Sequence, residues 1–140
     1  MESMSPISQF AIPVRVYYED TDAAGVVYYA NYLRFLERCR TEWIRHLGYG
    51  QEALAREQDL AFVVKAVNLE YLRPARLDDA LHVTLSVEKL GRAQIIFRQT
   101  ILRQDVVLLT GTVQVVSVQA SKMKPTSIPE PLRSQLETLL

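Results

Sequence analysis

The spacing of apolar residues over positions 31–47 constrains the fold of this chain more than any other feature. Apolar side chains recur there every third or fourth residue, and charged side chains fill the opposite face. This pattern predicts one long helix with a single buried stripe, with Asn31 as its N-cap and Gly48 as its stop signal. A helix with so apolar a stripe requires a sheet to pack against. The stripe consists of Tyr32, Phe35, Leu36, Cys39, Trp43, Ile44 and Leu47.

The segments on either side of this helix supply the sheet. Period-two alternation is clearest over 81–88, where apolar and polar residues alternate strictly. The same signal predicts one strand before the helix and four after it, with a second short helix at 51–57. The strands are expected over 13–19, 61–72, 81–88, 94–103 and 106–118. Hairpin-like connections at 90–92 and 104–105 then predict an α+β fold, in which an antiparallel five-stranded sheet curls around the long central helix.

A chain of 140 residues corresponds to one domain. We divide it into an N-terminal arm over 1–12, a domain over 13–125, and a C-terminal tail over 126–140 for which a short helix is expected. The sixteen basic and sixteen acidic residues cancel, so the charge does not favour a nucleic-acid partner. No apolar stretch reaches the roughly 18 residues of a membrane span. A single cysteine and the lack of a signal peptide lead us to expect a cytoplasmic protein.

Three carboxylates, Glu19, Asp20 and Asp22, lie shortly before the predicted helix, and Gly25 follows where a turn needs positive φ. One interpretation is a solvated turn whose aspartate caps backbone N–H groups. The other is an active site, in which a carboxylate attacks an acyl carbonyl or activates water while N–H groups at the helix start stabilise the oxyanion. A calcium loop is less favoured, because no regularly spaced oxygen ligands follow. The residues alone leave the first two interpretations open.

Other chemistries are excluded by what the chain lacks. It contains neither a Gly-x-Ser-x-Gly elbow nor a glycine-rich phosphate loop. His46 and His82 fall on polar faces and are expected to be exposed, whereas Cys39 falls on the apolar face and is expected to be a buried thiol. Histidine and cysteine are too few for a metal site, so we expect none.

Residues 14–32, read as VRVYYEDTDAAGVVYYANY, closely resemble the acyl-CoA thioesterases of the hot-dog fold. The resemblance is strongest to the YbgC type, which is associated with the Tol–Pal system, and 4-hydroxybenzoyl-CoA thioesterase is a near relative. It continues through residues 37–42, 61–64, 71–79 and 122–125. It implies a helix enclosed by the sheet, an acyl-CoA substrate, and no metal or prosthetic group. It also implies homodimers paired sheet edge to sheet edge, with active sites at the interface and further association into homotetramers.

The same resemblance assigns roles within the site. Asp22 matches the catalytic carboxylate, acting as nucleophile or as general base, and Tyr29 falls where a backbone N–H polarises the thioester carbonyl. Tyr18 matches a pocket tyrosine. Many members of the YbgC type carry histidine where this chain carries Tyr29, whereas the 4-hydroxybenzoyl-CoA relative carries tyrosine. A histidine-assisted step is therefore unavailable to this chain. The resemblance does not decide which acyl group is the substrate, and aromatic or longer acyl groups stay open. Further substrate contacts are assigned to Val63 and Val64. By charge and position near strand ends, Lys65, Lys89, Arg92, Lys122 and Lys124 are candidate partners of the coenzyme A phosphates, and the alternative is that each is an ordinary solvated side chain.

The sequence therefore predicts an acyl-CoA thioesterase that releases a free acid and coenzyme A. The alternative is an acyl-CoA-binding or envelope-machinery interaction protein with little catalysis. A hot-dog dehydratase is less favoured, because no histidine lies near the acidic run.

Overall fold

The computed structural model describes residues 9–140, so most of the predicted N-terminal arm lies outside the described residues. Its core is one antiparallel sheet with the spatial order β1-β3-β4-β5-β2. A two-residue strand, β6 (Lys124–Pro125), adds to β5. The five predicted strands are thus confirmed, with this short sixth strand beside them. Their bounds are β1 Phe10–Arg15, β2 Leu60–Tyr71, β3 Ala80–Leu90, β4 Gln94–Arg103 and β5 Val106–Gln119.

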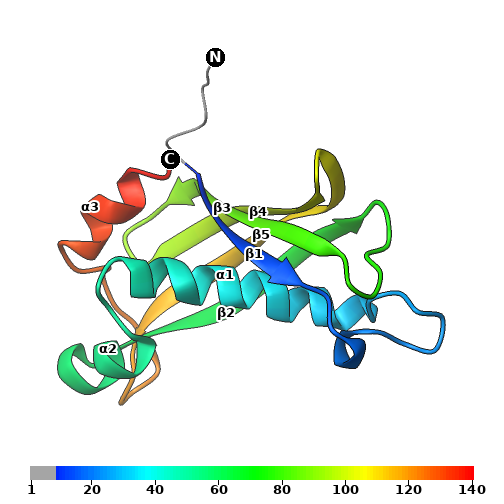
Figure 1. Cartoon of the computed structure of the whole chain (residues 1–140). Helices are drawn as coiled ribbons and strands as arrows, with labels where there is room; N and C mark the ends of the chain where they lie inside the picture. The colour runs from blue at the N-terminus through cyan, green and yellow to red at the C-terminus, as the bar shows by residue number, and fades with distance from the viewer. Residues whose placement is uncertain (1–8) are drawn as a thin grey trace.

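The long helix α1 (Tyr32–His46) lies across one face of this sheet (Figure 1). Its predicted stripe is buried from Tyr32 to Ile44, and the indole of Trp43 packs edge-on against the ring of Phe97 at 6.4 Å between centroids. Phe35 and Leu36 are fully buried, and burial of a side chain of that size contributes about 1.5–3 kcal/mol. The curled sheet around a central helix is the hot-dog fold that the sequence predicted.

Two short helices lie at the same end of this layer (Figure 1). Helix α2 (Gln51–Gln58) leads into β2, and α3 (Leu132–Glu137) confirms the helix expected in the C-terminal tail. Leu132 and Leu136 of α3 join the core, and the Val87 N–H donates to the Leu139 carbonyl at 2.9 Å. None of the helices described over residues 9–140 is long and apolar enough to cross a membrane.

The first strand differs from its prediction. It was expected over 13–19, but β1 begins at Phe10 and ends at Arg15, so residues 10–12 of the assigned arm belong to the sheet. Pro13 is tolerated because β1 is an edge strand. After Arg15 the Tyr17 N–H donates to the Asp20 carboxylate at 2.8 Å, which bends the chain into a 3-10 turn over Tyr18–Asp20.

The predicted N-cap of α1 was also wrong. Asn31 has helical backbone angles and makes no side-chain cap, because a 3-10 turn over Tyr29–Asn31 runs directly into α1. Its amide instead donates to Asp20 Oδ1 at 2.7 Å. The helical segment therefore starts at Tyr29, while its stop follows the prediction, with Gly48 at φ +95°.

Candidate active site

Residues 20–28, named here the acid turn, form a tight hairpin. Thr21 and Val27 form an antiparallel bridge, and the Asp22 N–H donates to the Val26 carbonyl at 2.9 Å. Gly25 closes the tip with φ +80°, a conformation that residues with a Cβ rarely adopt, and its N–H donates to the Asp22 carbonyl. The hairpin therefore fixes the backbone of Asp22 from both sides.

The Asp22 side chain is exposed at the tip of this hairpin. Its Oδ1 accepts the Ala24 N–H at 2.9 Å, an Asx turn that orients the carboxylate. Its Oδ2 has no hydrogen-bond partner among residues 9–140. The carboxylate is thus held in place by one oxygen and presents the other outward.

Tyr29 begins the helical segment immediately after the acid turn. Within the described part of the chain its N–H has no acceptor, as expected for the first residue of a helical segment. The preceding N–H, of Tyr28, donates to the Asp20 carbonyl at 3.0 Å, and the Tyr29 carbonyl accepts the Tyr71 hydroxyl at 3.1 Å. The Tyr29 peptide is therefore fixed on both sides while its N–H stays available, and the helix dipole adds positive potential there.

Asp20 is the buried member of the acidic run. Its two carboxylate oxygens accept hydrogen bonds from the Tyr17 N–H and the Asn31 amide. It consequently ties the end of the β1 segment to the start of the helix, a supporting role. Glu19 is exposed and lies in the same 3-10 turn.

An aromatic hollow lies beside the Tyr29 peptide. Its volume is about 280 Å³, and the rings of Tyr32 and Tyr71 meet edge-on at 5.5 Å between centroids. Burial raises the pKa of both phenols, so they remain protonated at neutral pH. Sequence reasoning did not assign Tyr71 to the site by itself; only the strand pairing brings it there. The lining residues are Val27, Tyr29, Tyr32, Tyr71, Leu72, Arg73 and Pro74.

The remaining predicted residues near the turn differ in their placement. Tyr18 lies in the adjoining 3-10 turn with its side chain 82% exposed. On β2, Val64 pairs with the buried Val115, faces the helix and lines a small cavity between α1 and the sheet. Val63 pairs with Val116 on the opposite face, so the two valines do not share a surface. Lys65 is the exposed residue at a β-bulge.

The predicted basic partners of coenzyme A do not lie near Asp22 of the same chain. Tyr71, at the end of β2, contacts Tyr29, whereas Leu60, at its start, pairs with Gln119 beside the 121–124 turn. Strand β2 spans roughly 40 Å at about 3.3 Å per residue, so Lys122 and Lys124 lie at the far end of the sheet. Lys89 and Arg92 lie at that end too, since β3 starts near the acid turn and ends at them.

The other chemically notable residues are structural or solvent-facing. Cys39 is fully buried, its thiol donates to the Val83 carbonyl at 3.3 Å, and burial raises its pKa to about 12, so it is no nucleophile at neutral pH. His46 and His82 are exposed, as predicted. Across the described residues, no three side chains of His, Cys, Asp or Glu cluster in a way that could hold a metal ion.

Comparison with known proteins identifies the family to which the chain belongs. A family model described as the thioesterase-like superfamily matches residues 16–136. The chain is 47% identical over 130 residues to the acyl-CoA thioesterase YbgC of Haemophilus influenzae, covering 93% of this chain and 96% of the relative. It is 44% identical to the acyl-CoA thioester hydrolase YbgC of Escherichia coli, covering 91% and 96%. A probable thioesterase from Bartonella henselae superposes with a TM-score of 0.82 at 34% identity, covering 86% and 99%.

Proposed function

The chain belongs to the thioesterase-like superfamily, and we propose that it is an acyl-CoA thioester hydrolase in which Asp22 carries the chemistry. The observation that carries this proposal is the acid turn itself. It presents Oδ2 of the Asp22 carboxylate and leads directly to the Tyr29 N–H. Neither this oxygen nor this N–H has a hydrogen-bond partner among residues 9–140. The named activity of relatives that are 44–47% identical over nearly the whole chain supports the same reaction.

The reaction converts a thioester and water into a carboxylic acid and the thiol of coenzyme A. In one route Asp22 acts as general base: it takes a proton from water, the water oxygen bonds to the acyl carbon, and the carbon–sulfur bond then breaks as Asp22 returns the proton to the leaving sulfur. In the other route the Asp22 carboxylate attacks the acyl carbon itself and coenzyme A leaves as its thiolate, which takes a proton from solvent. Water then hydrolyses the resulting anhydride to the free acid and restores the Asp22 carboxylate. Both routes need an accessible carboxylate, and the exposed tip of the hairpin provides it.

The Tyr29 N–H supplies the second component, a donor for the developing oxyanion. A donor fixed in advance is effective because it needs no reorganisation during the reaction, and one such donor contributes about 10²- to 10³-fold in rate. Its fixation comes from the Tyr28 N–H bond to the Asp20 carbonyl and the Tyr71 hydroxyl bond to the Tyr29 carbonyl. The role belongs to the backbone, so a tyrosine side chain at this position is compatible with it.

We propose that two copies pair through β2 and that such dimers associate into homotetramers. Strand β2 is the outer strand opposite β1, and its valines are more than one-third exposed in the single chain. A long apolar edge strand is a template for pairing with another strand. These valines are Val63, Val64 and Val67.

Antiparallel pairing of two β2 strands also accounts for the basic residues. It places the Tyr71 end of one strand toward the Leu60 end of the other, so the 121–124 turn of each subunit approaches the acid turn of its neighbour. The cations that are distant within one chain thereby become partners for the coenzyme A phosphates in the dimer. Lys65, Lys89, Arg92, Lys122 and Lys124 form this proposed set.

The proposed reaction uses no metal or prosthetic group, because a carboxylate, water and a backbone N–H supply its base or nucleophile and its oxyanion donor. We place the enzyme in the cytoplasm, since a single buried thiol fits a reducing compartment.

The test is a panel of acyl-CoA substrates, from short aliphatic to aromatic acyl groups, with the released thiol detected colorimetrically. We expect at least one acyl-CoA to release coenzyme A with a kcat/KM in the range of about 10⁴–10⁸ M⁻¹s⁻¹ that is typical of enzymes. Tight binding of acyl-CoA without thiol release from any member of the panel would instead favour a binding protein.

A further inference from the structure

We propose that Arg103 and Asp79 form a positioning pair that holds the acid turn against the start of α1. This inference rests on the proposed function, because its consequence is the alignment of Asp22 and the Tyr29 N–H. It concerns two residues at the ends of strands, neither of which contacts Asp22. The connection runs through residues 72–79, named here the β2–β3 loop.

The β2–β3 loop contacts both the acid turn and the start of α1. The Ala75 carbonyl accepts the Val27 N–H at 2.8 Å, and Val26 forms an antiparallel bridge with Arg76. The Ala75 N–H donates to the Tyr32 hydroxyl at 3.0 Å. Ala75 is fully buried, and it thus joins the acid turn to the first residue of α1. A displacement of Ala75 would move one part of the site relative to the other.

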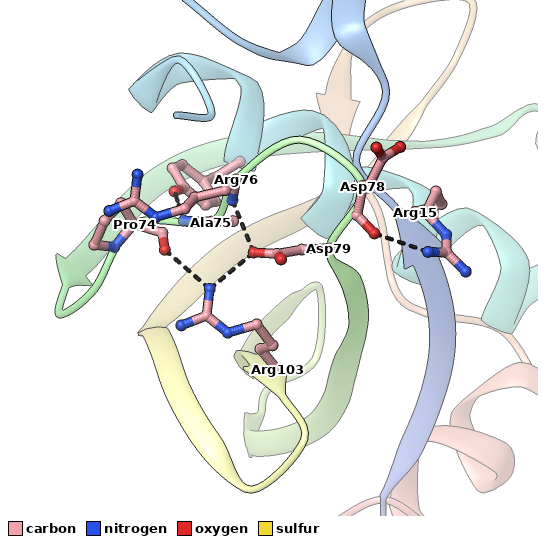
Figure 2. Close-up of polar contacts among 8 residues, drawn as sticks. Arg15, Pro74, Ala75, Arg76, Asp78, Asp79 and Arg103 are labelled. Atoms are coloured by element: carbon pink, nitrogen blue, oxygen red, sulfur yellow. Dashed lines mark hydrogen bonds and ion pairs between the residues drawn. The ribbon is translucent and has the colours of Figure 1, made fainter. Parts of the chain in front are cut away.

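Asp79 and Arg103 hold the β2–β3 loop in place (Figure 2). Asp79 Oδ2 accepts the Arg76 N–H at 2.8 Å and the Arg103 Nη1 donor at 2.8 Å. The same Nη1 reaches the Pro74 carbonyl at 3.4 Å. Pro74 and Arg76 are the two neighbours of Ala75 in the chain. The pair therefore holds the loop on both sides of the residue that contacts the site.

The β2–β3 loop is also bonded to the chain just after β1, before the acid turn. The Val16 N–H donates to the Asp79 carbonyl and the Asp78 N–H donates to the Val16 carbonyl, both at 3.0 Å. Arg15 donates through Nη1 to the Asp78 carbonyl at 2.8 Å (Figure 2). The loop is thus anchored to the chain at Val16, before the acid turn, and at Val27, within the second arm of the turn. Asp79 takes part in the first anchor through its backbone and in the loop turn through its side chain.

Burial distinguishes this ion pair from the other pairs formed by described residues. The Arg103 and Asp79 side chains are 34% and 20% exposed, whereas those of Arg98 on β4 and Glu88 on β3 are 49% and 43% exposed. A partly buried pair is less screened by solvent, so its loss has a larger effect on local geometry. Misplacement of catalytic groups by about 1 Å lowers turnover by about 10²-fold.

The experiment compares Arg103→Gln and Arg103→Lys with the matched control Arg98→Gln, using the most active acyl-CoA of the panel. We expect Arg103→Gln to lower kcat about tenfold or more, to leave KM within about twofold, and to speed amide hydrogen exchange at Val27 and Ala75. Lysine can place one cationic nitrogen between Asp79 and the Pro74 carbonyl, so Arg103→Lys should recover kcat to within about threefold of wild type. Arg98→Gln should change neither kcat nor the exchange at Val27.

A wild-type kcat in Arg103→Gln would overturn the inference, and so would a lowered kcat with unchanged exchange at Val27. If Arg103→Gln fails to fold, the same readings are taken from Asp79→Asn, which removes the negative charge of the pair and keeps an acceptor for the Arg76 N–H. Failure of the proposed function has a different signature: full turnover in Asp22→Asn. The exchange readings need no turnover and remain interpretable in that case.

Discussion

At the scale of single residues, Asp20 and Asp22 of the acidic run have different roles. Asp20 turns inward and accepts two hydrogen bonds, one from the Tyr17 N–H and one from the Asn31 amide. Asp22, two residues later, turns outward with one oxygen available. The buried carboxylate gives the acid turn its shape, and the exposed one carries the proposed chemistry.

Asn31→Ala tests this division. The substitution removes a charge-assisted hydrogen bond and leaves Asp20 buried with one acceptor oxygen unsatisfied, which costs about 1–3 kcal/mol. We expect the free energy of unfolding in urea to fall by that amount and kcat to fall with it, since Asn31 ties the helix start to the acid turn. An unchanged stability would show that Asp20 does not depend on the amide.

The sequence could predict the exposed residue better than the buried one. Asp22 lies in a run whose resemblance to known thioesterases marks its role. The partnership of Asp20 with Asn31 is not visible in the sequence, because the two are eleven positions apart in a segment without periodicity. Asn31 also fails to cap the helix as expected, because it is the last residue of a 3-10 turn and its amide donates to Asp20.

At the scale of elements, the edge strand β2 packs unusually close to its neighbour β5 at Gly111. Gly111 faces Leu69, and a Cβ there would lie 2.3 Å from the Asn68 carbonyl oxygen and 2.6 Å from the Leu69 side chain. Only glycine fits this contact. It allows β2 to run on to Tyr71, whose hydroxyl supports the Tyr29 peptide.

Gly111→Ala should therefore separate the two strands. We expect a loss of about 1–3 kcal/mol in the free energy of unfolding, because the obstructing atoms include backbone. Gly91→Ala is the matched control: its Cβ would lie 3.5 Å from the nearest atom, an ordinary contact, so stability should stay within about 0.5 kcal/mol. Equal stability of the two variants in chemical denaturation would contradict this account of the pairing.

The elements with strong periodicity were predictable, and those shaped by distant contacts were not. Strand β4 matches its predicted bounds at both ends, and the turn after it falls at Gln104, with φ +55°. The end of β1 was missed because a side chain, Asp20, bends the backbone there. The β2–β3 loop has no periodic pattern in its sequence. Its shape could not be predicted, because it depends on a bond from Arg103 of β4 to Asp79, 24 residues away in the sequence.

At the scale of the whole molecule, the site of one chain is incomplete without a second copy in the proposed assembly. The acid turn lies at one end of the sheet, and Lys89, Arg92, Lys122 and Lys124 lie at the other. Edge-to-edge pairing of β2 brings the two ends together. A substitution that prevents β2 pairing should therefore abolish both the assembly and the thioesterase activity.

Val67→Lys tests that coupling. Val67 lies in β2 and is 41% exposed in the single chain, so lysine is tolerated in the monomer but opposes pairing of the edge. We expect sedimentation to shift from dimer or tetramer to monomer, with loss of thioesterase activity. Val106→Lys, also 41% exposed but at the start of β5, should keep both the assembly and the activity. A monomeric Val67→Lys enzyme with full activity would contradict the shared site.

The central claim is that the Asp22 carboxylate carries acyl-CoA hydrolysis, and one comparison of kcat tests it most directly. Asp22→Asn keeps an acceptor for the Ala24 N–H and should fold like the wild type, while Glu19→Gln neutralises a neighbouring exposed acid as its control. We predict that Asp22→Asn lowers kcat for the best substrate by about 10²- to 10⁴-fold and that Glu19→Gln leaves it within about twofold. A folded Asp22→Asn enzyme that turns over at a rate similar to Glu19→Gln would contradict the account.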